Sequence, residues 1–293
     1  MEFLRKIFDN AHQKLNSSEK TKKFFPLIDA FDTLMFTPNH VTKNGAHIRD
    51  AIDLKRTMML VIIALVPCLL FGIYNTGYQH YRVLNQLADV SFLEIVLQGA
   101  FVVLPLVVVS YGAGLLVEFI FAIRNGHTVQ EGFLVSGMLI PLCMPADVPL
   151  WMVAVATIFA VVIGKEVFGG TGMNILNVAL TARVFLYFGF PSDISGDVWT
   201  YYGENRDEVI SGYSGATPLS IGAETVNKEE SNSVVNLMYE YSSDVQVNNF
   251  YSFENMFIGS IPGSIGETSA LMCLIGAFIL IFIIRCNRIL PLR

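Results

Sequence analysis

Long apolar runs follow a polar N-terminal part of the chain. Residues 57–81 and 95–117 carry no formal charge, and each run is long enough to cross a lipid bilayer as a helix. Further apolar segments follow at 149–164, 174–190 and 268–284. This pattern predicts an all-α polytopic membrane protein.

One further apolar segment, residues 132–146, is short and interrupted by prolines. It is typical of a short or half-spanning helix. Counted as a crossing, it brings the expected number of transmembrane helices to about six. The second long run can continue through residues 119–123, which would place Glu118 inside the bilayer.

Charge in the polar segments predicts the orientation. Residues 1–56 hold ten Lys and Arg against seven Asp and Glu, whereas residues 191–267 hold two against twelve. Basic segments stay in the cytoplasm. We therefore expect a cytoplasmic N-terminal segment over 1–56, transmembrane helices over 57–190, an outside loop over 191–267, and a last helix with a basic end over 268–293. The apolar face of an amphipathic helix over 3–15 suits a membrane surface or another protein equally.

Composition narrows the function classes. Apolar residues make up 53% of the chain and charged residues 15%, where soluble proteins carry about 25% charged residues. A soluble enzyme and a disordered chain are therefore excluded. The net charge of −6, with no basic stripe, argues against a nucleic-acid partner. The four cysteines show no C-x-x-C spacing, so we expect no metal site and no disulfide.

A glycine-rich stretch, GKEVFGGTGMNILN at residues 164–177, follows the fourth apolar segment. We expect a new helix to begin near Thr171, which would place Asn174 and Asn177 on one helical face. Amides there can hydrogen-bond the edge of a heterocycle. A plain helix–loop–helix turn at the membrane edge would show the same pattern.

Four charged residues fall within or beside the apolar runs: Glu118, Lys165, Glu166 and Arg183. Charges at bilayer depth are expensive and are therefore functional candidates. We expect Glu118 to take part in cation entry or release. The alternative is a structural carboxylate that reaches water or pairs with Arg183.

The acidic loop contains SGYSGATPL at residues 211–219. Its small residues and Pro218 indicate an exposed turn that presents the Thr217 hydroxyl. From chemistry alone, a tight turn and an attachment site both explain this stretch.

This stretch resembles the flavinylation motif of the membrane subunits of sodium-pumping NADH:quinone oxidoreductase, although the family motif begins with Asp where this chain has Ser211. DLKRTMM, IGKEVFGGTGMNILNVALTARVF and FIGSIPGSIGETSAL resemble the B subunits of that family. The B subunits have ten helices in two inverted repeats. The resemblance implies that this chain is truncated and supplies the first repeat and one helix more.

The resemblance also implies site residues. Thr217 would carry FMN through a phosphoester, Asn174 and Asn177 would line a non-covalent riboflavin, Gly114 would lie in the quinone region, and Glu118 would couple sodium. Electrons would pass from FMN through riboflavin to ubiquinone or menaquinone. Implied partners are the other subunits of the complex, a flavin transferase and the bilayer of a bacterial inner membrane.

Two alternatives remain beside this interpretation. The D subunit of the ion-translocating ferredoxin:NAD oxidoreductase is similar in fold and flavin motif, but it usually lacks a polar extension like residues 1–56. A flavin-free solute channel would have no reason to keep Ser-Gly-Ala-Thr in a loop.

Overall fold

The computed structural model describes residues 54–84, 86–125, 132–194, 198–201 and 252–289. Within these residues every regular element is helical, which confirms the predicted fold class. The elements, in chain order, are α4 (Leu54–Val83), α5 (Phe92–Asn125), α6 (Gly132–Leu142), α7 (Leu150–Gly164), η1 (Glu166–Phe168), α8 (Val178–Gly189), α9 (Pro191–Ile194), α13 (Phe253–Ile258) and α14 (Ala270–Ile289). The amphipathic helix expected over 3–15 lies outside the described residues.

Three described helical stretches are long and apolar enough to cross a membrane: Thr57–Val83, Phe92–Asn125 and Leu150–Phe168. The apolar helices Gly132–Leu142, Val178–Gly189 and Ala270–Ile283 are shorter. The 34 residues of α5 correspond to about 51 Å at 1.5 Å per residue, well beyond a hydrocarbon core of about 30 Å. This helix is therefore tilted or projects from the bilayer, and it continues past Glu118 without a break.

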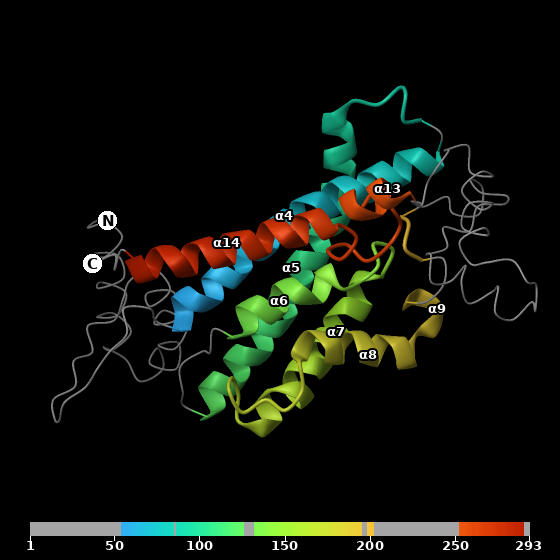
Figure 1. Ribbon diagram of the computed structural model, residues 1–293. Coiled ribbons are helices and arrows are strands. Elements are labelled where there is room, and N and C mark those ends of the chain that lie inside the picture. Colours follow the sequence, from blue (N-terminus) through green and yellow to red (C-terminus); the bar gives the residue numbers. More distant parts are fainter. Residues whose placement is uncertain (1–53, 85, 126–131, 195–197, 202–251, 290–293) are drawn as a thin grey trace, which may run out of the picture.

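Glycines bring α4 close to its neighbours. In Figure 1, α4 and α14 run side by side in opposite directions. An ideal Cβ at Gly276 of α14 would lie 2.4 Å from the Ala64 carbonyl oxygen of α4. At the crossing of α4 with α5, a Cβ at Gly77 would lie 1.9 Å from the Ile95 oxygen. Small residues at such crossings let helix backbones approach closely in a membrane, where dispersion contacts drive association.

The short helix α6 ends among buried residues at Leu142, rather than at the predicted residue 146. A helix end leaves carbonyl groups without intrahelical partners, and in a membrane the protein itself must satisfy them. Three consecutive carbonyls here accept hydrogen bonds from distant segments: Leu142 O from Gly266 N at 2.8 Å, Met144 O from Ile265 N at 3.2 Å, and Cys143 O from Arg183 Nη1. The loop before α14 and one side chain of α8 thus stabilise the break in α6.

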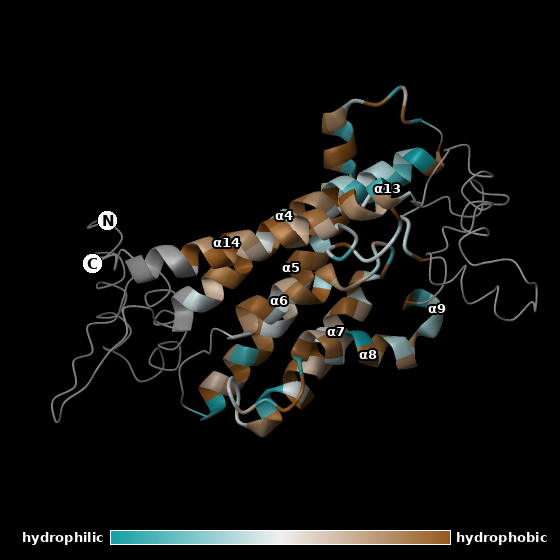
Figure 2. Cartoon of the chain, viewed as in Figure 1, coloured by the Kyte–Doolittle hydropathy of each residue, from teal (hydrophilic) through white to brown (hydrophobic). Residues whose placement is uncertain are grey.

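The core of the described part of the chain lies where α5, α6 and α7 meet, around fully buried residues such as Leu106, Phe133 and Val153. Large apolar side chains are also exposed, including Phe101, Val108 and Phe278. Figure 2 shows hydrophobic colour over most of α5, α7 and α14, with hydrophilic colour gathered where α4 ends. Apolar residues on the outside as well as the inside are typical of a protein that sits in lipid.

Candidate functional site: a buried charge group beside a glycine loop

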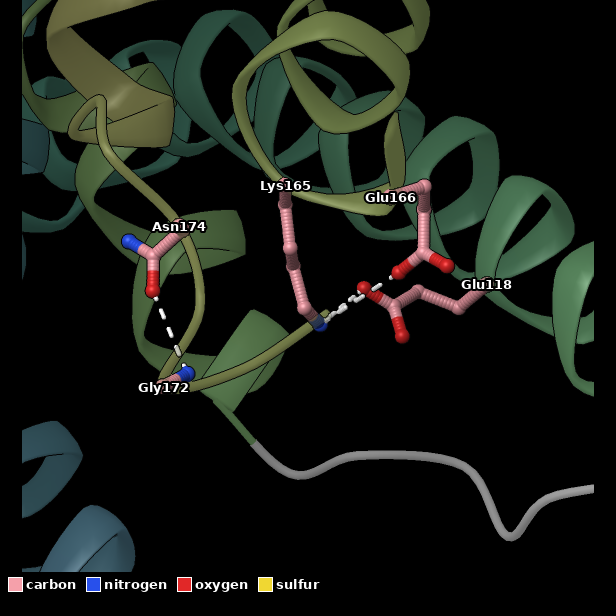
Figure 3. A network of polar contacts seen from close by, with 5 residues as sticks. All are labelled: Glu118, Lys165, Glu166, Gly172 and Asn174. Atoms are coloured by element: carbon pink, nitrogen blue, oxygen red, sulfur yellow. Dashed lines mark hydrogen bonds and ion pairs between the residues drawn. The ribbon is translucent and has the colours of Figure 1, made fainter. Parts of the chain in front are cut away.

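Three charged side chains meet where α5 approaches the end of α7 (Figure 3). The Lys165 ammonium forms an ion pair with Glu118 Oε1 and lies 3.9 Å from Glu166 Oε1. All three side chains are 3% exposed. Buried charges occur only where they are paired, since a lone charge in a low-dielectric interior is very costly. Glu118 is thus buried with Lys165 as an ion-pair partner that the sequence did not predict, and its role in cation movement stays a prediction.

The backbone after α7 holds Lys165 and Glu166 in place. Lys165 caps α7, and η1 begins at the next residue. The Lys165 carbonyl accepts hydrogen bonds from Phe168 N at 3.2 Å and Gly170 N at 3.1 Å. Gly169 has φ 108°, a left-handed conformation that favours glycine, and this residue ends η1. The glycine loop thus folds the chain back while both charged side chains point into the bundle.

Arg183 does not join this group. Its guanidinium donates to the Cys143 carbonyl oxygen, and its Cζ lies 5.3 Å from the centroid of the Trp199 ring. The suggested pairing of Glu118 with Arg183 is therefore wrong. Arg183 instead donates a hydrogen bond to a backbone carbonyl just after the end of α6. The positive charge beside Glu118 comes from Lys165, which lies 47 residues further along the chain.

The asparagines of the glycine loop are placed differently from the prediction. The helix expected near Thr171 begins at Val178, so Asn174 and Asn177 do not share a helical face. Asn177 is the N-cap of α8, and its Oδ1 accepts from Ala179 N at 3.0 Å and Leu180 N at 3.2 Å. The reason is local: an Asn oxygen satisfies the first free N–H groups of a helix better than one more helical turn does.

Asn174 stabilises the loop itself. Its Oδ1 accepts from Gly172 N at 3.3 Å, and its Nδ2 donates to Leu176 O at 3.2 Å. Both asparagines are exposed, next to the exposed apolar side chains of Met173 and Ile175. The contact of these asparagines with a riboflavin ring stays a prediction. Because the Asn177 oxygen already caps α8, this residue has only its amide N–H groups to offer such a ring.

Gly114 lies on α5 against a phenyl ring. An ideal Cβ at this position would be 1.8 Å from Phe133 Cζ, and Gly114 is buried. Phe133 is itself fully buried and makes an edge contact with the Tyr111 ring at 6.4 Å between centroids. Gly114 thus receives the tip of this ring, and its place in a quinone region stays a prediction.

Thr217, with the whole SGYSGATPL stretch, lies outside the described residues. Its role as a flavin attachment site stays a prediction. The described site consists of the charge group, the glycine loop and the Gly114–Phe133 contact. The end of α5, η1 and the loop before α8 all lie at the end of the bundle where α4 begins (Figure 1).

Long apolar helices, with a group of charged side chains buried between them, define a helical, multi-pass membrane protein. The chain belongs to the NQR2, RnfD, RnfE family, whose model matches residues 41–292. This membership confirms the resemblance found in the sequence motifs.

Several curated proteins similar to this chain are B subunits of the Na(+)-translocating NADH-quinone reductase. The B subunit of the Na(+)-translocating NADH-quinone reductase of Chromohalobacter salexigens is 38% identical over an alignment of 298 positions that spans 95% of this chain and 66% of that protein. The B subunits of the same reductase in Klebsiella pneumoniae (strain 342) and Stutzerimonas stutzeri are 38% and 37% identical, again over 95% of this chain and over 70% and 68% of their own lengths. The chain spans about two thirds of the length of these curated relatives.

Proposed function

We propose that this protein is the membrane-embedded B subunit of a sodium-translocating NADH-quinone reductase, acting with the other subunits of that complex in a bacterial inner membrane. The observation that carries the proposal is the buried Glu118–Lys165–Glu166 group in a chain whose relatives bear this name. A pump needs an ionisable group at bilayer depth that can exchange its cation partner. Glu118 meets that need, with sodium as the transported substrate.

Redox chemistry in this proposal comes from two flavins. FMN linked to Thr217 and a non-covalent riboflavin near Asn174 and Asn177 would supply electron transfer, which the side chains of this chain do not provide. The exposed apolar residues of the glycine loop would hold the riboflavin ring, and the Asn177 amide N–H groups would be its hydrogen-bond donors. The Asn177 oxygen is engaged at the start of α8.

The quinone, ubiquinone or menaquinone, takes the electrons next to α5 in this scheme. There Gly114 leaves room for the buried Phe133 ring, so the quinone would lie beside this contact rather than on the ring itself. The charge pattern predicts that the loop over 191–267 lies outside, so Thr217 and the flavin transferase would meet on the outer side of the membrane. The glycine loop would then lie near the cytoplasmic side.

Covalent flavin is tested by fluorescence after denaturing electrophoresis. In cells that express the flavin transferase, the wild-type chain should give a fluorescent band under ultraviolet light. Thr217→Ala should abolish the band, whereas Ser214→Ala, in the same loop, should keep it. Absence of a band from wild type that Ser211→Asp does not restore would overturn the FMN assignment.

Sodium coupling is tested with a matched pair of variants on α5. Glu118→Gln removes the buried carboxylate, and Glu94→Gln removes an exposed one at the start of the same helix. In the reconstituted complex, Glu118→Gln should raise the sodium concentration for half-maximal turnover, and Glu94→Gln should not. An unchanged sodium dependence in Glu118→Gln would remove this residue from the mechanism.

A further inference from the structure

Two buried amide side chains near the end of α4 form a relay of hydrogen bonds. Gln79 Nε2 donates to Asn75 Oδ1 at 3.3 Å, and Asn75 Nδ2 donates to the Ile261 carbonyl oxygen at 3.0 Å. A flipped amide at either position would set two acceptors or two donors against each other. The Gln79 oxygen, Oε1, is therefore the acceptor at the start of the relay and faces away from Asn75.

This Gln79 oxygen lacks a donor. Gln79 is 2% exposed, and its Oε1 accepts no hydrogen bond from the residues that the structure describes. A buried acceptor in this state costs free energy, and native proteins supply a partner for nearly all such groups. Because the orientation of the amide is fixed, the partner has to bring an N–H or O–H group.

A second incomplete polar group belongs to the short segment 198–201. Thr200 is 1% exposed, and its hydroxyl has no hydrogen-bond partner in the described part of the chain. The segment packs against α4 through its next residue: His80 Nδ1 donates to the Tyr201 carbonyl oxygen at 2.9 Å, and the two rings lie 5.6 Å apart between centroids. Gln79 and Thr200 are thus the sequence neighbours of the two residues in this contact, in the region where Figure 2 shows hydrophilic colour at the end of α4.

The proposed FMN would be tethered near the same end of α4. Tyr201 leads into the outside loop, and Thr217 follows it by 16 residues, which span about 54 Å at most. The charge pattern also predicts that α4 ends on the outer side of the membrane. An FMN ring on Thr217 is therefore within reach of Gln79 and Thr200, whereas the riboflavin proposed at the glycine loop would lie near the other end of the bundle.

One edge of a flavin ring matches these two groups. Its imide carries one donor, N3–H, between two carbonyl acceptors. Gln79 Oε1 requires a donor, and the Thr200 hydroxyl is able to donate to a carbonyl. The chemistry of the two incomplete groups thus fits the FMN ring.

We propose that Gln79 Oε1 accepts the N3–H of the FMN ring and that the Thr200 hydroxyl donates to an adjacent ring carbonyl. This inference rests on the proposed covalent FMN at Thr217 and adds to it the place where the ring binds. The two contacts act on the redox potential in opposite directions. An acceptor at N3–H favours the oxidised ring, in which this N–H is the stronger acid, whereas a donor at a carbonyl favours the reduced ring, whose oxygens carry more negative charge.

The test uses the purified complex and two measurements on the FMN. Resonance Raman spectra in H2O and D2O report the hydrogen bond at N3–H, and a spectroelectrochemical titration reports the midpoint potential. The difference between wild type and Thr217→Ala isolates the signal of this flavin from that of any other. Gln79→Leu should weaken the N3–H signature and raise the midpoint potential, whereas Thr200→Val should lower the potential. Each change should alter the ratio of oxidised to reduced FMN at a fixed potential by about threefold or more.

A matched pair of charge variants gives an independent check. Gln79→Glu keeps an acceptor of similar shape and adds a negative charge beside the ring, so it should lower the midpoint potential. Gln86→Glu adds the same charge at an exposed position beyond the end of α4 and should leave the potential as in wild type. If Gln79→Leu does not assemble, equal potentials in Gln79→Glu and Gln86→Glu would overturn the proposal.

Failure of this inference is distinct from failure of the proposed function. The covalent FMN fails when wild type gives no fluorescent band that depends on Thr217, and the inference then falls with it. With the band present, an unchanged N3–H signature and potential in Gln79→Leu would overturn the inference alone and would assign the Gln79 oxygen to water or to another part of the protein. A shift of the same sign in Gln79→Leu and Thr200→Val would overturn it as well.

Discussion

Replacement of Gly99 by alanine should destabilise the protein by separating α4 from α5. An ideal Cβ on Gly99 would lie 1.8 Å from the Ile73 carbonyl oxygen, whereas such atoms essentially never approach within 3.0 Å. The obstacle is helix backbone, so no side-chain rotation relieves it, and the helices must part by more than about 1 Å. Overpacking of this kind costs about 3 kcal/mol or more, and the better helix propensity of alanine returns only about 1 kcal/mol. The expected net loss is about 2 kcal/mol or more.

Gly112 on the same helix is the matched control, because a Cβ there would meet no atom within 4 Å. Gly112→Ala should leave stability unchanged or raise it by up to about 1 kcal/mol. Thermal unfolding in lipid nanodiscs, followed by labelling of the buried Cys68 with a thiol-reactive dye, measures both variants. Gly77→Ala added to Gly99→Ala should cost less than it does alone, since the helices have already moved apart. Equal melting temperatures for Gly99→Ala and Gly112→Ala would refute the reasoning.

Three further predictions concern contacts described above. Gly114→Ala should lower the melting temperature because its Cβ would strike Phe133, and Phe133→Leu should recover part of the loss in the double variant; no recovery would show that the ring is not the obstacle. Asn177→Leu should remove the N-cap of α8 and lower the free energy of unfolding by about 1 kcal/mol. Asn177→Asp should keep the cap and lose only non-covalent riboflavin, measured as flavin released on denaturation. An equal loss of stability in both variants would contradict the role of Asn177 as a cap. A membrane-permeant oxidant should form a disulfide bond between Cys68 and Cys273, whose Sγ atoms lie 3.8 Å apart. Proteolytic fragments that contain these two cysteines should then stay together until the disulfide is reduced. Full recovery of free thiols after oxidation would contradict the packing of α4 against α14.

Helices of the main bundle could be predicted because lipid imposes a simple rule on their sequences. A span must be long, apolar and uncharged, and the runs at 57–81, 95–117, 149–164 and 268–284 follow that rule. Each coincides with a helix of the structure: α4 and α5 extend beyond their runs at both ends, α7 matches its run to within one residue, and α14 is displaced a few residues toward the C-terminus. Hydropathy does not distinguish a helix from an apolar loop. For this reason the apolar segment 174–190 was expected to be helical from a start near Thr171, whereas α8 begins only at Val178. Ile175 is 75% exposed in the loop before α8, although the hydropathy of its sequence neighbours is typical of a helix.

The candidate site was predictable only in part. Glu118 stood out because a carboxylate in an apolar run is rare. Its partner could not be deduced from the sequence, since Lys165 and Arg183 are equally plausible counter-charges until helix packing decides between them. The contact between Gly114 and Phe133 left no sequence signal either. A glycine in a membrane helix shows that something approaches closely, but it does not show which side chain.

The broken end of α6 has a consequence for the order in which the molecule is built. Two of its carbonyls, those of Leu142 and Met144, find donors in the loop before α14, where Glu267 also meets Cys143 across 124 residues of chain. A ribosome completes α6 long before it makes that loop. During synthesis the nascent chain must therefore shelter these two peptide carbonyls in water or in the translocon until α14 enters the membrane, whereas Cys143 O already has its donor once α8 is made. Insertion of α14 is thus the event that completes α6, and a variant that delays α14 should leave α6 open to proteases while every earlier helix is already in place.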